Sequence, residues 1–151
     1  MSRNVQPSSL GLRSIELLQG VAPEKLEALA RQCAWRNYEA GKRIISRNAA
    51  DRDVYFLVAG RVRITTYSLG GRQVTFRDIG AGEILGEVAA LDERPRSADV
   101  IALEPALVAA LAAAAFRKLL VDQPEVGRRV MTRLACLVRS LSERVIDLST
   151  L

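Results

Sequence analysis

The stretch VYFLVAGRVRITTYSLGGRQVTF, residues 54–76, decides the fold class of this chain. It holds three apolar or alternating runs separated by glycines, which are Val54–Val58, Val62–Thr66 and Val74–Phe76. The alternation in Arg61-Val62-Arg63-Ile64-Thr65 is typical of a half-buried antiparallel strand. Ser68-Leu69-Gly70-Gly71 suits a hairpin turn, because glycine tolerates a positive φ. The stretch therefore predicts antiparallel strands joined by tight turns.

Further short strand patterns surround this stretch on both sides. They are Ile44–Ile45, Ala98–Ala102 and Ala106–Leu111. Glycines at 41, 60, 80 and 82 punctuate the same region at turn positions. Short strands so closely spaced predict a small antiparallel β-roll, jelly-roll-like in its architecture.

Helical patterns flank the predicted roll, so the expected fold class is α+β. Before the roll, one short helix is expected around residues 12–18 and a second from Pro23, a favoured first-turn residue. After the roll, helices are expected over Ala112–Val121 and from Pro124 to about Leu148. The predicted organisation is a loose leader over 1–8, the roll with its helices over 9–123, and a long helix over 124–151.

The long C-terminal helix carries a seven-residue leucine repeat. Leu134, Leu141 and Leu148 define the repeat, and Leu137, Val138 and Val145 lie three or four residues after its members. Such a seam favours a coiled coil with a second copy of the chain, and thus a homodimer. The alternative is a helix that packs on its own roll.

Composition excludes several classes of function. The chain has 151 residues and no histidine, which excludes Ser-His-Asp and Cys-His catalysis and any imidazole-based metal site. The two cysteines, Cys33 and Cys136, are too few for a four-thiolate zinc or an iron–sulfur cluster, so no metal or cofactor is expected. The net charge of +5 is scattered along the chain and does not by itself indicate nucleic-acid binding.

The sequence also indicates where the protein resides. No secretory signal pattern opens the chain, and the longest apolar run, Ala106–Phe116, is too short to cross a bilayer. We therefore expect a cytoplasmic protein that does not contact membranes.

The segment with chemical content is ILGEVAALDERPRSA, residues 84–98. Gly86 allows close backbone approach before a short helix, whose first N–H groups favour an anion. Arg96 and Ser97 add a guanidinium and a hydroxyl, which together suit a phosphate. Glu87 can accept a hydrogen bond from a ribose hydroxyl. The segment predicts a nucleoside monophosphate site.

Apolar residues complete this prediction, and one alternative remains beside it. Phe76, Ile79 and Leu85 would supply an apolar wall next to the phosphate site. Alternatively, Glu87 and Arg96 form an ion pair that spans a surface loop and bind no ligand.

Leu85-Gly86-Glu87-Val88-Ala89, followed by Pro95-Arg96-Ser97-Ala98, resembles the phosphate-binding cassette of cyclic nucleotide-binding domains. The order of helices, glycine-punctuated roll and long helix is similar to that of the Crp/Fnr family of bacterial transcription regulators. The resemblance implies that Glu87 binds the ribose 2′-OH and that Arg96 and Ser97 bind the cyclic phosphate. It also implies contacts from further residues, namely Gly86, Val88, Phe76, Ile79, Leu85, Leu141 and Ser142. Of these, Ser142 would reach the base of the ligand bound by the partner subunit.

This chain departs from the family pattern at three places. Leu85 replaces a common phenylalanine and keeps the wall apolar, whereas Leu141 replaces a base-contacting hydroxyl and Leu137 an arginine. Ser142 remains as a polar base contact, and cAMP is the expected ligand in preference to cGMP. Haem- and oxygen-sensing branches do not fit a chain without histidine and with two cysteines.

The resemblance implies a sensory domain and not an enzyme. In the family pattern a hinge and a helix-turn-helix follow the long helix, and this chain ends at Leu148-Ser149-Thr150-Leu151, where the hinge would begin. An excised sensor is therefore expected, which would reach DNA through a domain absent from these residues. Three alternatives stay open: a cyclic nucleotide-binding module of a channel or kinase, a ligand-free dimerisation scaffold, and a cupin-type enzyme.

Overall fold

The computed structural model describes residues 3–4, 8–67, 70 and 73–149, without the side chains of 3–4, 73–76 and 147–149. Contacts within the chain divide it into two compact units, Met1–Arg117 and Lys118–Leu151. The boundary between the units falls inside a helix, whereas the sequence predicts one at residue 123. The predicted organisation into 1–8, 9–123 and 124–151 stays a prediction.

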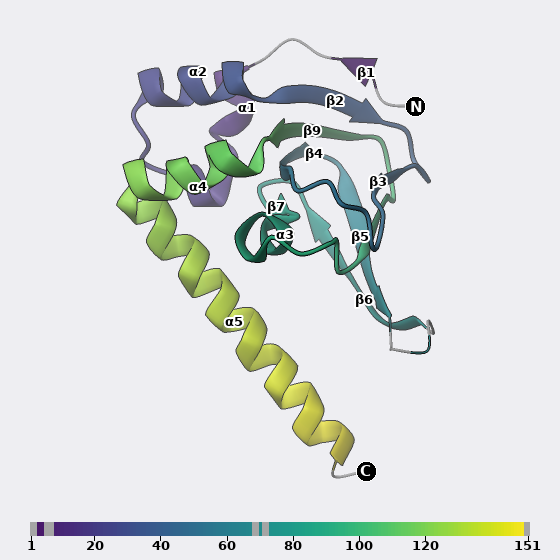
Figure 1. The fold of residues 1–151 in the computed structure, drawn as a ribbon. Coiled ribbons are helices and arrows are strands. Elements are labelled where there is room, and N and C mark those ends of the chain that lie inside the picture. The colour runs from purple at the N-terminus through teal and green to yellow at the C-terminus, as the bar shows by residue number, and fades with distance from the viewer. Residues whose placement is uncertain (1–2, 5–7, 68–69, 71–72, 150–151) are drawn as a thin grey trace. The chain divides into compact units, whose positions relative to one another are not determined.

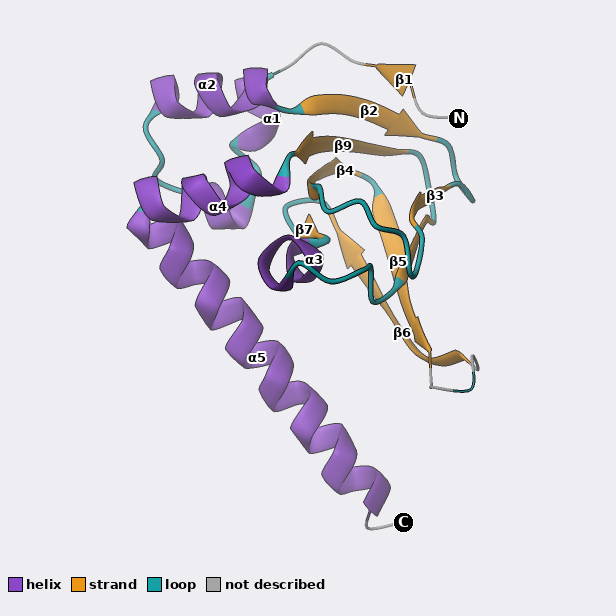
Figure 2. Cartoon of the chain, viewed as in Figure 1, coloured by secondary structure: helices purple, strands orange, loops and turns teal. Residues whose placement is uncertain are grey.

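Two antiparallel sheets form the first unit (Figures 1 and 2). The described strands are β1 (Arg3–Asn4), β2 (Ala34–Tyr38), β3 (Arg43–Ile45), β4 (Val54–Ala59), β5 (Arg61–Tyr67), β6 (Gln73–Gly80), β7 (Ile84–Leu85), β8 (Asp99–Ala102) and β9 (Ala106–Leu111). One sheet has the order β1-β2-β9-β4-β7, and the other has the order β3-β8-β5-β6. The α+β class with an antiparallel β-roll, short N-terminal helices and a long C-terminal helix is confirmed.

The core of the roll takes side chains from both sheets. Its buried members include Leu57 and Val108 of the first sheet and Val62 and Val100 of the second. Strands β4 and β9 pair along most of their length, and their apolar character reflects this burial. The core therefore holds the two sheets against each other and fixes the loops at their ends.

The helices of the described chain are α1 (Ser9–Leu12), the 3₁₀ helix η1 (Glu16–Leu18), α2 (Pro23–Gln32), α3 (Glu87–Asp92), α4 (Ala113–Asp122) and α5 (Pro124–Ser149). Helices α1 and α2 pack together near β2. The indole N–H of Trp35 donates to the carbonyl of Ala30 at 2.9 Å, which ties β2 to the end of α2. The side chain of Trp35 also lies close to Gly11, where an added Cβ would be 3.1 Å from the ring.

The prediction of a single helix over residues 12–18 is wrong. Helix α1 ends at Leu12, Ile15 is extended with φ −79° and ψ 121°, and η1 begins at Glu16. Leu12, Ile15 and Leu18 are all buried. Their spacing of three residues suits a tight turn and a 3₁₀ helix, because side chains at i and i+3 align there.

Three strands differ from the sequence prediction. Arg3 pairs with Asn37 and Asn4 with Arg36 of β2, so two residues of the predicted leader form a strand that the sequence did not predict. Strands β2 and β7 were not among the predicted runs, because β2 is half polar and β7 has two residues. The polar residues of β2 are tolerated between β1 and β9 because Trp35 alone of its side chains is buried.

The predicted hairpin is confirmed by its strands. Thr66 pairs with Thr75 and Tyr67 with Gln73, and β6 continues past the predicted end to Gly80. Of the predicted turn, Ser68, Leu69 and Gly71 lie outside the described residues.

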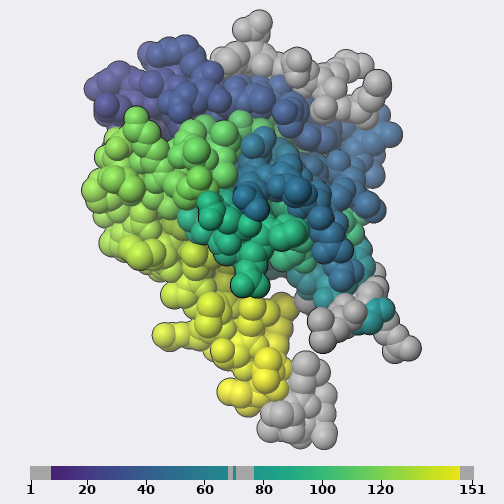
Figure 3. All heavy atoms as spheres, in the orientation of Figure 1, coloured from purple at the N-terminus to yellow at the C-terminus, as the bar shows by residue number. Residues whose placement is uncertain are grey.

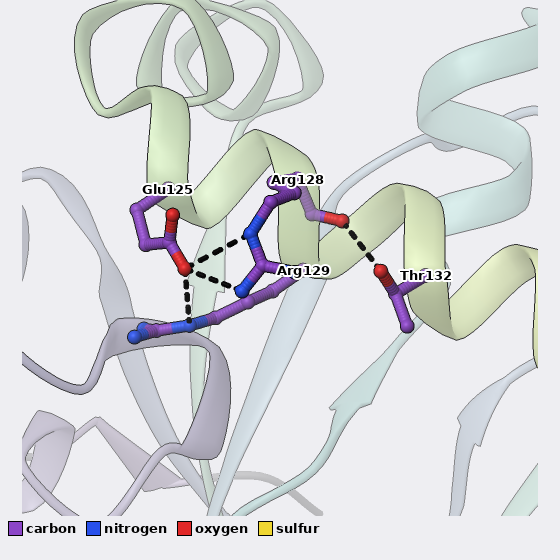
Figure 4. Close-up of polar contacts among 4 residues, drawn as sticks. All are labelled: Glu125, Arg128, Arg129 and Thr132. Atoms are coloured by element: carbon purple, nitrogen blue, oxygen red, sulfur yellow. Dashed lines mark hydrogen bonds and ion pairs between the residues drawn. The ribbon is translucent and has the colours of Figure 1, made fainter.

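The second unit is dominated by α5, which is 26 residues long. In its first turn the carboxylate of Glu125 accepts a hydrogen bond from the Nε of Arg128 at 3.0 Å and lies 3.8 Å from the Nε of Arg129 (Figure 4). The hydrogen bond from Arg128 lowers the pKa of Glu125. Further along, Val138, Leu141 and Val145 are 64%, 56% and 64% exposed, whereas the side chain of Leu148 is outside the described set. A search of the described helices finds none with the length and hydropathy needed to span a bilayer.

Candidate functional site

The turn between β7 and α3 depends on Gly86. This residue has φ +80°, in the left-handed region, and caps the N-terminus of α3. A Cβ at this position would lie 2.5 Å from the Nη1 of Arg96 and 2.9 Å from the carbonyl oxygen of Asp53. Glycine is therefore required both by the backbone conformation and by the close approach of Arg96.

Arg96 is a buried arginine whose guanidinium is held by three groups. Its side chain is 2% exposed. Nη1 donates to the Gly86 carbonyl at 3.0 Å, and Nη2 donates to the Asp51 carboxylate at 2.8 Å and to the Asp53 carbonyl at 2.7 Å. The Nε of Arg96 is buried and has no hydrogen-bond partner among the described residues. A buried N–H without an acceptor is costly, so this atom is suited to receive an acceptor from a ligand.

The two members of the ion pair between Arg96 and Asp51 differ in their exposure to solvent. The side chain of Asp51 is 48% exposed, so the ion pair joins a buried cation to a half-exposed anion. The guanidinium carbon lies 5.8 Å from the centroid of the Tyr55 ring, within the range of a cation–π contact. Burial is the main cause that raises the pKa of Tyr55. The ring therefore stays neutral and offers an aromatic face to the cation.

The loop between β3 and β4 also forms hydrogen bonds with the main chain of Arg96. The N–H of Asn48 donates to the Arg96 carbonyl, and the N–H of Arg96 donates to the Ala49 carbonyl, both at 2.9 Å. The guanidinium of Arg52 donates to the carbonyl of Glu93, at the end of α3. Figure 3 shows these two segments, blue and teal-green, side by side on the surface of the first unit.

The other cassette residues lie near Arg96 in the sequence, and their side chains differ in exposure. Glu87 opens α3 and is 5% exposed, and a carboxylate at a helix N-terminus is electrostatically favourable. Val88 is 40% exposed, and Ser97 is exposed beside the buried Arg96. Arg96 forms an ion pair with Asp51, and the alternative of an ion pair between Glu87 and Arg96 stays a prediction.

The predicted apolar wall is partly described. Ile79 and Leu85 are 7% and 1% exposed and belong to the core of the roll. The backbone of Phe76 lies in β6 opposite Thr65, and its side chain is outside the described set. Leu141 and Ser142 lie on α5 in the second unit, and both are exposed.

Sequence reasoning missed the residues that hold Arg96. Asp51 and Asp53 precede Arg96 by more than 40 residues, and the pattern Asp51-Arg52-Asp53 looks like an ordinary polar loop. A general signal was available, because an arginine in an apolar environment needs a carboxylate or carbonyl partner. That signal does not say which of the acidic residues is the partner.

Comparison with known proteins identifies relatives of this chain. The family model described as cyclic nucleotide-binding domain matches residues 35–123. The cyclic AMP receptor protein of Thermus thermophilus is 31% identical over 93% of this chain and 63% of its own length. The CRP-like cAMP-activated global transcriptional regulator of Mycobacterium tuberculosis is 23% identical over 87% of this chain and 59% of its own length.

A solved structure supports the same grouping. The crystal structure of the Thermus thermophilus catabolite activator protein matches with a TM-score of 0.77 and 31% identity, over 88% of this chain and 62% of that one. This chain spans between 59% and 63% of the length of the two curated relatives.

Proposed function

This chain belongs to the cyclic nucleotide-binding domain family, and from that premise we propose that it is the cyclic nucleotide sensor of a Crp/Fnr-type transcription regulator. The ligand is cAMP in preference to cGMP, and it shifts a dimer equilibrium that controls a DNA-binding domain absent from these residues. The observation that carries the proposal is the buried guanidinium of Arg96, whose Nε has no hydrogen-bond partner in the described part of the chain, beside the close-packed Gly86.

A cyclic phosphate matches what Arg96 lacks. Its oxygens can accept a charge-assisted hydrogen bond from the Nε–H that has no described acceptor. The Nη2 is shared by Asp51 and the Asp53 carbonyl, so a phosphate would compete with the half-exposed Asp51 carboxylate for the same cation. The exposed Ser97 hydroxyl and the first N–H groups of α3 add neutral donors for the same anion.

Glu87 supplies the selectivity for a sugar. A carboxylate next to a phosphate site would repel a ligand that brought only anionic groups. A ribose offers the 2′-OH as a donor, which a carboxylate accepts strongly. The combination of Glu87 with Arg96 therefore favours a nucleotide over inorganic phosphate.

The exposed apolar stripe on α5 supports a homodimer. Val138, Leu141 and Val145 share the predicted seam and are more than half exposed. Apolar side chains in a continuous stripe on a helix are typical of a surface covered by a second helix. In the proposed dimer Leu141 and the partner's Ser142 would contact the base, and the ligand would favour one helix arrangement over another.

The proposed role is binding and not catalysis, and the location expected from the sequence, the cytoplasm, is part of the proposal. In this proposal DNA is bound through a domain that is not among these residues.

Isothermal titration calorimetry with cAMP and with cGMP tests the proposal. We expect saturable binding near one ligand per chain, tighter for cAMP, and a strong loss in Arg96→Lys, which keeps the charge but not the planar fork. Arg63→Lys is the matched control, because Arg63 is also paired with an aspartate, Asp78, but on the exposed face of β5. Absence of binding to either nucleotide would refute the proposal and leave the dimerisation scaffold as the remaining function.

Size-exclusion chromatography with light scattering tests the dimer. A mass of twice 16.5 kDa is expected with cAMP. A monomer with bound cAMP would instead favour a module of a channel or kinase whose long helix packs on its own roll.

A further inference from the structure

A second buried acidic residue lies three positions after Arg96. Asp99 is the first residue of β8 and is 8% exposed. Its Oδ1 accepts from the backbone N–H of Arg47 at 2.7 Å, and its Oδ2 accepts from the Tyr67 hydroxyl at 2.7 Å. The guanidinium of Arg47 in turn lies 4.9 Å from the centroid of the Tyr67 ring. The Asp99 carboxylate thus links β5 and β8 to Arg47, which lies two residues after the end of β3.

The loop that Asp99 anchors is the one that surrounds Arg96. We call residues 46–53 the clasp segment. Directly after Arg47, the backbone of Asn48 and Ala49 forms two hydrogen bonds with the backbone of Arg96. The same segment then supplies the Asp51 carboxylate and the Asp53 carbonyl to the Arg96 guanidinium. The position of the guanidinium therefore depends on where the clasp segment begins.

The clasp segment contains a strained residue close to this anchor. Asn48 has φ +68°, one of two positive-φ residues other than glycine among the described part of the chain. Asparagine tolerates the left-handed region better than most residues, but the conformation still costs free energy. Such a conformation persists where surrounding contacts over-determine it. The bonds at the Arg47 and Asn48 N–H groups precede the N–Cα bond of Asn48, and the bond from Arg96 to the Ala49 carbonyl follows it, so hydrogen bonds hold the chain on both sides of this φ angle.

We infer that Asp99 is a positioning residue for ligand binding, which acts on the cyclic phosphate through the clasp segment and Arg96. By accepting the Arg47 N–H, Asp99 fixes the start of the clasp segment, and the clasp segment holds the guanidinium with its Nε free for a phosphate. The inference rests on the proposed function, because it assigns Asp99 a role in that same site.

The charge of Asp99 strengthens this anchor. Burial raises the pKa of its carboxyl, but the hydrogen bonds from Arg47 and Tyr67, together with the charges of Arg43 and Arg47, outweigh burial and lower the pKa below its ordinary value. Asp99 is therefore ionised at neutral pH. A carboxylate makes shorter and stronger hydrogen bonds than a neutral acceptor.

The test compares Asp99→Ala with Asp99→Asn and with the control Asp78→Ala. Asp78 is also paired with an arginine on the second sheet, but its side chain is more exposed and contacts Arg63 instead of the clasp segment. We expect cAMP affinity to fall about tenfold in Asp99→Ala, the equivalent of one net hydrogen bond to a charged group. The loss should be smaller in Asp99→Asn, because the amide oxygen still accepts from the Arg47 N–H, and Asp78→Ala should match the wild type.

A spectroscopic readout separates positioning from mere stability. The ¹⁵N–¹H resonance of the Arg96 Nε–H, assigned by its absence in Arg96→Lys, reports the environment of the guanidinium without any ligand. Positioning predicts that this resonance shifts and exchanges faster with solvent in Asp99→Ala at a temperature where the protein is folded. A structural role alone predicts a lower thermal midpoint with the resonance and the affinity unchanged, and that result would overturn the inference.

Two further outcomes keep the inferences apart. If wild-type protein binds neither nucleotide, the proposed function fails. The Arg96 Nε–H resonance in Asp99→Ala still decides whether Asp99 positions Arg96, because a shift supports that role and an unchanged resonance contradicts it. If Asp99→Ala does not fold, Tyr67→Phe, which removes one hydrogen bond without a cavity, must still shift the resonance and weaken binding. An unchanged resonance and affinity in folded Tyr67→Phe would then refute the role.

Discussion

Replacing Gly86 by alanine tests the geometry of the site more directly than any other single change. The new Cβ would lie 2.5 Å from the Nη1 of Arg96 and 2.9 Å from the Asp53 carbonyl oxygen, at a backbone φ of +80°. Gly20→Ala is a matched control, because Gly20 has φ +83° and open space around an added Cβ. The two variants share the backbone strain and differ in the clash.

The expected magnitudes follow from this difference. An alanine in the left-handed region costs about 1–2 kcal/mol, which should be the whole loss of unfolding free energy in Gly20→Ala. Gly86→Ala must in addition displace Arg96, and one lost hydrogen bond from a charged group costs about 1.5–3 kcal/mol. The total of about 2.5–5 kcal/mol does not exceed domain stabilities of about 5–15 kcal/mol, so we expect the domain to stay folded.

Urea unfolding followed by circular dichroism gives both free energies, and calorimetry with cAMP gives the functional effect. We expect Gly86→Ala to lose measurable cAMP binding and Gly20→Ala to bind as the wild type does. Equal destabilisation of the two variants, or full binding by Gly86→Ala, would refute the close approach of Arg96 to Gly86 and the reasoning built on it.

Other perturbations probe the ion pair, the pH dependence and the dimer. Asp51→Asn should lower the unfolding free energy of the ligand-free protein by about 1–2 kcal/mol, since one partner is half exposed, and should bind cAMP no more weakly than the wild type in calorimetry. Because folding lowers the pKa of Asp99, the stabilisation from its ionised carboxylate is complete above the unfolded pKa of about 3.9 and is lost as pH falls through the folded pKa. In urea melts between about pH 5 and 2, the free energy of unfolding should therefore fall less for Asp99→Asn than for the wild type. Leu141→Glu, at a 56% exposed seam position, should shift the chain from dimer to monomer in light scattering without lowering its thermal midpoint by more than about 2 °C.

Local patterns were informative wherever a few neighbouring residues set the backbone. The alternation around Val62 and the glycines of the roll predicted antiparallel strands, and β5 and β6 pair as a hairpin. Gly86 was predicted to let the backbone approach a ligand, which stays a prediction; the structure shows that its φ is positive and that Arg96 lies close to it. The heptad spacing predicted a long helix, and α5 runs from Pro124 to Ser149. In each case the conformation depends on contacts within one or two turns of chain.

Local patterns failed where distant contacts compete with them. Arg3–Asn4 look like a polar leader but pair with β2, because β2 presents a sheet edge to them. The apolar spacing around Ile15 looks like one helix, but the burial of Leu12, Ile15 and Leu18 together breaks it into two. Strand β7 has two residues, too few to show a period, and exists because β4 offers it a pairing edge.

The sequence by itself determined the fold class and the family, because these depend on residue types at short, regular spacing, and on the same basis it predicts the cassette residues Gly86, Glu87 and Arg96. Only the tertiary structure decided what Arg96 contacts. A buried guanidinium must be satisfied by whichever groups the fold brings within hydrogen-bond distance, and here those groups are Asp51 and the Asp53 carbonyl from a loop more than 40 residues away. The packing of β3, β4 and β8 determines which groups contact Arg96, since no local preference couples residues so far apart in the chain.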